Sequence, residues 1–223
     1  MNKLSLKQKA YNEIKSKILH CEYMPNSFLN EDLLTEELGV SRTPIRDALS
    51  RLEQENLIKI VPKKGFFVTP LSLGEINMAI EARILIEPYV IRTYCGHLSS
   101  EVLESMYKSL QTARDCISTN DQHLMFALDD EFHRIILNQC NNHYILQAYN
   151  QVHNQNSRLR IISGRHDETR LLKTISEHAK VLDALAIRDL EGAAKAMEEH
   201  LLDSKNSSFQ AFMKNASLLS VQG

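Results

Sequence analysis

The segment from Leu29 to Val68 has the sequence LNEDLLTEELGVSRTPIRDALSRLEQENLIKIVPKKGFFV, and it decides the fold. Asn30 is a favourable N-cap, because its side-chain oxygen can accept a hydrogen bond from an unpaired backbone amide. Gly39 offers the left-handed conformation that ends many helices. The apolar face between them would consist of Leu33, Leu34 and Leu38. The segment therefore predicts a short helix that ends at Gly39.

A second helix is predicted directly after this turn. Ser41 or Thr43 can cap it, and Pro44 is tolerated in the first turn because the amide it lacks would be unpaired there anyway. The inward face would consist of Ile45, Ala48, Leu49 and Leu52. Arg42, Thr43 and Arg46 would gather at the N-terminal end of the outward side. A recognition helix presents such groups to the major groove of DNA, where an arginine binds guanine through two parallel hydrogen bonds.

A basic hairpin is predicted after the second helix. Residues 57–61 and 66–68 form two short apolar runs of the kind found in strands. The turn between them would consist of Pro62, Lys63, Lys64 and Gly65. A wing of this kind lies over the DNA backbone or the minor groove, and Gly65 would let its main chain approach closely. The order of these elements predicts a winged helix-turn-helix.

The positive charge of the chain is local. Residues 1–70 hold 11 Lys and Arg against 9 Asp and Glu, whereas residues 41–64 hold 6 against 3. Such a concentration indicates a DNA footprint rather than a generally adhesive protein. Residues 71–223 carry 15 basic against 19 acidic side chains, so this part is not expected to bind DNA.

Length and composition set the broad class. With 223 residues, 43% of them hydrophobic, the chain can form one small and one medium domain. No apolar run approaches the roughly twenty residues that span a bilayer, and the first residues lack a signal-peptide core. We therefore expect a cytoplasmic protein without a membrane partner. The four cysteines are far apart and form no Cys-x-x-Cys pair, which predicts reduced thiols.

From Ser72 onward every segment shows helical periodicity. Ser72 and Glu75 form a capping box, and Pro88 is expected to kink or break the helix that follows. Further helices are predicted at Ser99–Ser118, Asp121–Cys140, His143–Ile162, Glu168–Ile187 and Leu190–Met213. We predict a mostly α fold, with a winged domain at 1–70, a hinge around Pro70 and an antiparallel bundle of six or seven helices at 71–223. The core of such a bundle can hold a ligand.

Asp129 and His133 are the first candidate metal ligands. Their spacing of four residues places both on one helix face, where they could hold one ion. The same spacing also occurs on solvated faces and in local hydrogen bonds, so the pair alone decides nothing. His178 and His200 lie on the last two predicted helices, and a bundle can bring three helices to one point.

The N-terminal motifs resemble the DNA-binding domain of GntR-type bacterial transcription regulators. The matching segments are Ile14–Leu19, Leu29–Glu31, Leu38–Leu49 and Leu52–Glu53. The resemblance implies that DNA is contacted by Ser41, Arg42, Thr43 and Arg46, with Gly65 at the wing tip beside Lys63 and Lys64. The sequence departs from the family at one position, because Asp32 stands where some members have an arginine. We therefore do not expect a phosphate contact from Asp32.

The second half resembles the ligand-binding FCD domain of the FadR branch of these regulators. The matching motifs are Glu81-x-Arg83, Asp129-x-x-Phe132-His133, Glu177-His178 with Leu182–Leu185, and Ala196-Met197-x-x-His200. In that family the matching aspartate and three histidines bind a metal ion, which implies Asp129, His133, His178 and His200 as ligands. This donor set suits a divalent ion, with zinc as the most available candidate and nickel or manganese as alternatives.

Arg83 is the candidate anchor for an effector. A small carboxylate metabolite would fit beside the ion, and the planar fork of Arg83 matches a carboxylate. The alternative is a structural ion pair with Glu87, one helical turn further on.

These patterns together predict a homodimeric transcription regulator, most simply a repressor, on a pseudo-palindromic operator. A metabolite bound in the metal-containing bundle would control its affinity for DNA. One alternative is a regulator that senses the metal itself. Another is a metal-dependent hydrolase that uses a water activated at the same site, although no separate general base is evident. We expect a regulator rather than an enzyme.

Overall fold

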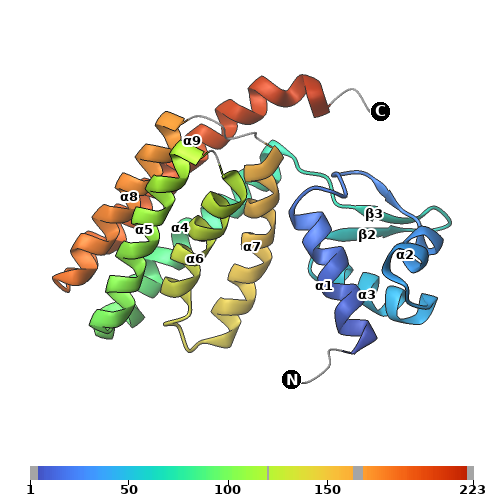
Figure 1. The fold of residues 1–223 in the computed structure, drawn as a ribbon, viewed down its shortest axis with the longest axis horizontal. Coiled ribbons are helices and arrows are strands. Elements are labelled where there is room, and N and C mark those ends of the chain that lie inside the picture. The colour runs from blue at the N-terminus through green and yellow to red at the C-terminus, as the bar shows by residue number, and fades with distance from the viewer. Residues whose placement is uncertain (1–4, 120, 163–167, 220–223) are drawn as a thin grey trace. The chain divides into compact units, whose positions relative to one another are not determined.

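The computed structural model describes residues 5–119, 121–162 and 168–219. The chain forms two compact units, one of Met1–Ile76 with His153–Ser163 and the other of Asn77–Val152 with Gly164–Gly223. Figure 1 shows a short sheet among the helices of the first unit and long helices alone in the second, so the predicted mostly α fold is confirmed. The boundary after residue 70 stays a prediction.

The first unit contains the two predicted helices and their turn. Its elements are α1 (Leu6–Leu19), β1 (Phe28–Leu29), α2 (Glu31–Leu38), α3 (Arg42–Gln54), β2 (Ile58–Val61) and β3 (Gly65–Val68). The Asn30 side chain accepts from the amides of Asp32 and Leu33, and Gly39 ends α2 with a φ of 62°. Both expected caps are confirmed. Ser41 occupies the N-cap position of α3, but its side chain makes no capping hydrogen bond.

The core of the first unit lies under α3. Its inward face is almost fully buried, as predicted, and consists of Ile45, Ala48, Leu49 and Leu52. The predicted apolar face of α2 is wrong at Leu33, which is 62% exposed, whereas Leu34 is buried. Successive helical residues differ by about 100°, so Leu34 shares its face with Leu38 but not with Leu33.

The wing is a three-stranded sheet with β3 in the centre. The antiparallel hairpin of β2 and β3 is confirmed, with Ile58 opposite Val68. β1 pairs with the other edge of β3, and two residues are too few to show a strand pattern in the sequence. Gly65 has a φ of 101°, and a Cβ atom there would lie 2.7 Å from the Phe28 ring. Glycine is therefore required here for two reasons: the positive φ angle and the close approach of the Phe28 ring.

In the part of the chain that the structure describes, six long helices build the bundle, as predicted. They are α4 (Leu73–Tyr94), α5 (Ser100–Thr119), α6 (Gln122–Leu137), α7 (His143–Ile162), α8 (Glu168–Ala186) and α9 (Leu190–Leu219), with a 3-10 turn at Cys95–His97. The Ser72 hydroxyl accepts from the Glu75 amide at 3.1 Å and so caps α4. The end of α7, from His153 onward, belongs to the first unit.

A break at Pro88 is wrong, because α4 continues to Tyr94, whereas a kink there stays a prediction. Pro88 and its neighbours Glu87, Val90 and Ile91 are all buried in the bundle. Tertiary burial on both sides of the proline outweighs the one backbone hydrogen bond that it cannot donate.

Two further expectations can be compared with the structure. All four cysteines are buried and none forms a disulfide, which confirms the thiol prediction. Within the described ranges, no helix has the length and apolarity needed to cross a bilayer.

The unequal burial of two leucines gives a test of the fold. Leu49→Ala should lower the free energy of unfolding by about 2–5 kcal/mol, because it leaves a cavity in the core under α3. Leu33→Ala is the matched control on α2 and should change it by no more than about 0.5 kcal/mol. Urea unfolding followed by circular dichroism measures both, and equal effects of the two variants would contradict the described core.

Candidate nucleic-acid interface and metal centre

The start of α3 presents the predicted DNA-contacting side chains on its outer side. Ser41, Arg42, Thr43 and Arg46 are exposed, whereas Pro44 and Ile45 turn inward. The side chains of Arg42 and Arg46 are each 63% exposed. The structure thus places the four residues where a duplex can reach them, and their contact with DNA stays a prediction.

Both arginines are held by carboxylates of α2. Arg46 donates from Nε to Glu31 Oε1 at 2.7 Å and from Nη2 to Glu31 Oε2 at 3.1 Å. Arg42 donates from Nε and Nη2 to a single oxygen, Asp32 Oδ1, at 3.0 and 2.6 Å. Asp32, the residue that departs from the family pattern, therefore has a partner within the protein. The sequence analysis did not foresee either pair.

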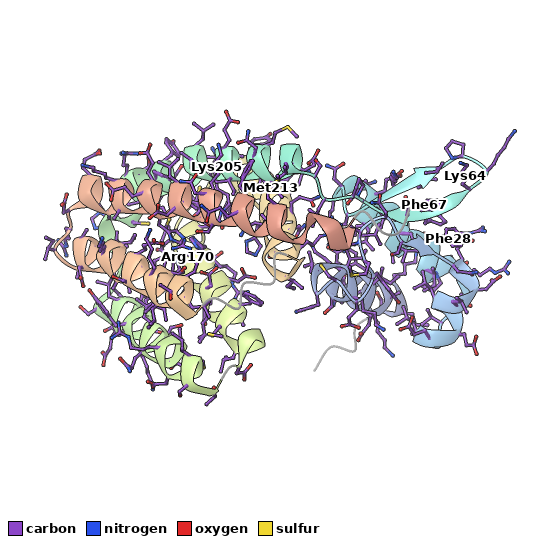
Figure 2. The ribbon with its side chains drawn as sticks, turned by 90° about the horizontal axis from the view of Figure 1, so that it is seen from above. Phe28, Lys64, Phe67, Arg170, Lys205 and Met213 are labelled. Carbon is purple, nitrogen blue, oxygen red and sulfur yellow. The ribbon has the colours of Figure 1, made fainter. Side chains whose placement is uncertain are left out.

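The wing tip carries two exposed lysines. Lys63 has a φ of 62°, and the Lys64 amide donates to the Val61 carbonyl at 2.9 Å, which closes the turn. Figure 2 shows Lys64 at the end of the hairpin, with Phe28 and Phe67 closer to the middle of the sheet. The basic tip has the shape expected of a wing, and its role on DNA stays a prediction.

Three predicted metal ligands converge in the bundle. His133 of α6, His178 of α8 and His200 of α9 each offer a ring nitrogen, and these nitrogens lie within 4.8 Å of one another. All three side chains are buried, with exposures of 2–3%. Among the described residues this is the one group of histidine, cysteine and carboxylate side chains with metal-binding spacing.

Two buried carboxylates orient two of the rings. Glu87 Oε2 lies 2.7 Å from Nδ1 of His133, and Glu177 Oε2 lies 2.7 Å from Nδ1 of His200. An ionised carboxylate only accepts, so Nδ1 is the donor in both pairs. This fixes the tautomer, so that Nε2 is the unprotonated nitrogen of each ring. Carboxylate–histidine pairs of this kind are the usual outer shell of a metal site.

The spacing between two of the three rings fits a bound ion. Nε2 of His178 and Nε2 of His200 are 3.3 Å apart. Two nitrogens bound to one zinc ion at about 2.0–2.1 Å with tetrahedral geometry are separated by about 3.3 Å. The Phe132 ring stacks on His178 at 3.8 Å and excludes solvent on that side. Donor chemistry, orientation and spacing therefore all suit a divalent transition metal ion.

Each orienting carboxylate is paired with an arginine. Arg83 Nε donates to Glu87 Oε1 at 2.6 Å, and Arg170 Nη1 donates to Glu177 Oε1 at 2.8 Å. Burial alone would raise the pKa of Glu87, but Arg83 and His133 hold it well below its usual range. Burial is likewise outweighed at Glu177, where hydrogen bonds from His200 and Arg170 lower the pKa to about 2. Both carboxylates are thus ionised near neutral pH.

His200 is neutral in this setting. Burial lowers its pKa to about 4, although the hydrogen bond to Glu177 acts in the opposite direction. A metal ion binds only the neutral imidazole. His200 is therefore already in the metal-binding form at neutral pH, and binding releases no proton from it.

Asp129 and Arg83 lie outside the group of three converging histidines. Asp129 Oδ1 lies 3.8 Å from Nε2 of His178, and the Asp129 side chain is 20% exposed. It borders the histidine group from the same helix face as His133, and its role as fourth ligand stays a prediction. Arg83 forms the ion pair with Glu87 that the sequence analysis gave as the alternative to an effector anchor. Its Nη2 atom makes no hydrogen bond to a described residue.

Sequence reasoning missed several members of this network. Glu177 was noticed only as the neighbour of His178, and its bond to His200 depends on how α8 and α9 pack. Arg170 lies two helical turns before Glu177 on α8, a spacing that could have suggested the pair. Tyr149 of α7 is buried and interacts with both Arg83 and Glu87. No pattern in the sequence indicates that contact.

Comparison with protein families gives two matches. Residues 6–68 match the model described as "Bacterial regulatory proteins, gntR family", and residues 78–203 match the FCD domain. The first range contains the helices and wing described above. The second contains all four predicted metal ligands together with Arg83.

Individual relatives agree with these matches. The chain is 25% identical over 209 residues to the HTH-type transcriptional repressor RspR of Escherichia coli, covering 94% of this chain and 91% of the repressor. Among solved structures, E. coli McbR/YncC has a TM-score of 0.83 at 20% identity, covering 94% of this chain and 100% of that one. A putative GntR regulator from Rhodococcus sp. RHA1 has a TM-score of 0.78 at 20% identity, covering 93% and 99%. The two structures support the fold.

Metal binding can be tested on the purified protein stripped with a chelator. Zinc at a free concentration of 100 times its dissociation constant should stabilise the folded state by about 2.7 kcal/mol. His178→Ala should lose this stabilisation, because it removes one of three converging nitrogens. Glu177→Gln should weaken zinc binding by about 10–100-fold, because it no longer fixes the His200 tautomer.

The control for this experiment is His97→Ala, which changes an exposed histidine outside the group. Isothermal titration with zinc and thermal unfolding with and without zinc measure the four proteins. Equal zinc binding by the wild type and His178→Ala would contradict the assignment.

Proposed function

Because the chain belongs to the gntR family of bacterial regulatory proteins and carries an FCD domain, we propose that it represses transcription in response to a metabolite. In this proposal a homodimer binds a pseudo-palindromic operator through two winged units. A small carboxylate metabolite binds beside a metal ion in the bundle and changes the affinity for DNA. The protein would act in the cytoplasm, where it can reach the chromosome.

The observation that carries the DNA-binding part is the exposure of Arg42 and Arg46 at the start of α3. Ser41 and Thr43 lie beside them, and their hydroxyls can donate to phosphate oxygens. Lys63, Lys64 and the main chain at Gly65 would contact the backbone or the minor groove from the wing. Two-fold symmetry of the protein then requires two-fold symmetry of the operator.

The effector part depends on the buried histidine group. His133, His178 and His200 would hold the ion, with Asp129 as a fourth ligand, and zinc is the best candidate for three imidazoles and one carboxylate. Nickel or manganese could replace it. Bound there, the ion would supply a positive charge and open coordination positions for the carboxylate oxygens of a metabolite.

Arg83 would orient the metabolite from the side of α4. Its Nε is already bound to Glu87, while Nη2 makes no hydrogen bond to a described residue. Both interpretations of Arg83 are therefore compatible, because an arginine has five N–H donors and Glu87 accepts from Nε alone, although Tyr149 also interacts with Arg83. A carboxylate group is the natural partner for the remaining donors.

The hydrolase interpretation is not retained. Relatives of the chain are HTH-type transcriptional regulators, and the family is not enzymatic. A regulator that senses the ion itself remains the second candidate, because the three histidines by themselves offer ring nitrogens close enough together to hold an ion.

The DNA-binding proposal predicts a steep salt dependence. If each protomer neutralises about four phosphates, the log-log slope of affinity against salt should be about −7 for the dimer. Arg46→Ala should cost about 1–3 kcal/mol on a duplex selected from a random library, and should relax the preference at one base pair in each half-site. Lys64→Ala is the control and should weaken selected and random duplexes alike. A flat salt response, or an equal loss on both duplexes for Arg46→Ala, would contradict the proposal.

The effector proposal predicts reciprocal coupling. A metabolite that weakens DNA binding tenfold must itself bind the DNA complex tenfold more weakly, which corresponds to about 1.4 kcal/mol. Fluorescence anisotropy of the selected duplex is measured with apo-protein, with zinc alone, and with zinc plus each of a panel of small hydroxycarboxylates. A change that requires both zinc and one carboxylate supports metabolite sensing, and a change with zinc alone supports metal sensing. No change in any mixture would contradict both.

A further inference from the structure

Glu31 and Asp32 carry negative charge into the face that meets DNA. They occupy the first turn of α2, directly beside the start of the recognition helix α3. A carboxylate that faces a phosphate backbone repels it, so two such residues should weaken binding to any duplex. Attraction to DNA therefore does not explain why two carboxylates lie here, but their contacts with Arg42 and Arg46 can.

The two acids hold their arginines differently. Glu31 accepts from Nε and Nη2 of Arg46 with both of its oxygens, so the carboxylate lies along one edge of the guanidinium plane. Asp32 meets Arg42 through a single oxygen. The Glu31 side chain is 22% exposed and that of Asp32 is 68% exposed. Glu31 is thus the more fixed of the two, and Arg46 is the better oriented arginine.

The donors that Glu31 leaves on Arg46 match one base. An arginine has five N–H groups, and the contact along the Nε edge uses one on Nε and one on Nη2. The outer edge keeps one N–H on Nη1 and one on Nη2, which point in parallel away from the protein. Guanine presents O6 and N7 as two parallel acceptors in the major groove, and no other base does so.

The same contact makes Arg46 a poor phosphate ligand. Neutralising the guanidinium with a carboxylate weakens its Coulomb attraction to the negatively charged backbone. The directional N–H pair on the outer edge stays in place for an uncharged base edge.

From this geometry we propose that Glu31 is a positioning residue for sequence recognition. It holds the Arg46 guanidinium so that its outer edge binds a guanine in each half-site and disfavours phosphate. The inference depends on the proposed DNA binding through α3, and it adds the residue that sets the specificity. Asp32 does not have this role, because its single-oxygen contact leaves Arg42 less constrained.

The test compares variants on a duplex selected by the wild type from a randomised double-stranded library. The guanine read by Arg46 is located with Arg46→Ala, and dissociation constants are measured for the selected duplex and for the same duplex with that guanine replaced. The wild type should prefer the guanine by about tenfold or more. Glu31→Gln should remove most of this preference while binding random duplexes at least as tightly as the wild type.

Two further variants separate positioning from charge. Glu31→Asp keeps the charge but shortens the side chain, and it should also lose the guanine preference. Asp32→Asn makes the same charge change as Glu31→Gln in the same helical turn, and it should keep the preference while binding all duplexes more tightly. Circular dichroism and thermal unfolding establish that each variant folds.

The outcomes distinguish this inference from the function on which it depends. A wild type that selects no sequence contradicts the proposed function and the role of Glu31 with it. If the wild type selects an operator, a full guanine preference in Glu31→Gln or Glu31→Asp overturns the role of Glu31 alone. An equal loss in Asp32→Asn overturns it as well, because charge would then explain the effect.

Discussion

The structure of the bundle depends on the burial of charged side chains that must be paired. Glu87 and Arg83 are almost inaccessible, and Glu177 is 7% exposed, so each charge has lost its water shell. An unpaired charge in such a place would be strongly destabilising, and a paired one often contributes little net stability. Well-packed apolar side chains of similar volume would stabilise the bundle equally well. We infer that the charges are kept because they orient His133 and His200, whose Nε2 atoms then share a space with that of His178.

An arginine–carboxylate pair also occurs at the recognition helix, but there it is exposed to solvent. Arg46 and Glu31 are bound as closely as Arg83 and Glu87, yet the Arg46 side chain is 63% exposed. Water and salt screen an exposed pair, which typically contributes less than about 1 kcal/mol to stability, so the Glu31 contact orients the arginine without supporting the fold. Burial thus makes the Arg83–Glu87 pair part of the core of the bundle, whereas exposure leaves the outer edge of Arg46 accessible to DNA while Glu31 holds its other edge.

Much of this could be predicted from local patterns. Asn30 and Gly39 mark the ends of α2 because capping depends on a few adjacent residues, and helical spacing located the buried face of α3. The three histidines were selected through resemblance, since spacing within one helix cannot show that α6, α8 and α9 converge. The pairs of Glu31 with Arg46 and of Glu177 with His200 depend on the packing of separate helices. The break at Pro88 was predicted wrongly, because burial on both sides of the proline outweighed the backbone hydrogen bond that it cannot donate.

The most direct test of the account is an X-ray absorption measurement on the zinc-loaded protein in solution. We expect a first shell at about 2.0–2.1 Å that contains three imidazole nitrogens, with the multiple-scattering pattern of histidine rings. The shell of His178→Ala should contain two. A wild-type shell made of oxygen alone, or one with fewer than three imidazoles, would contradict the claim that these three histidines, two of them oriented by buried carboxylates, bind one ion.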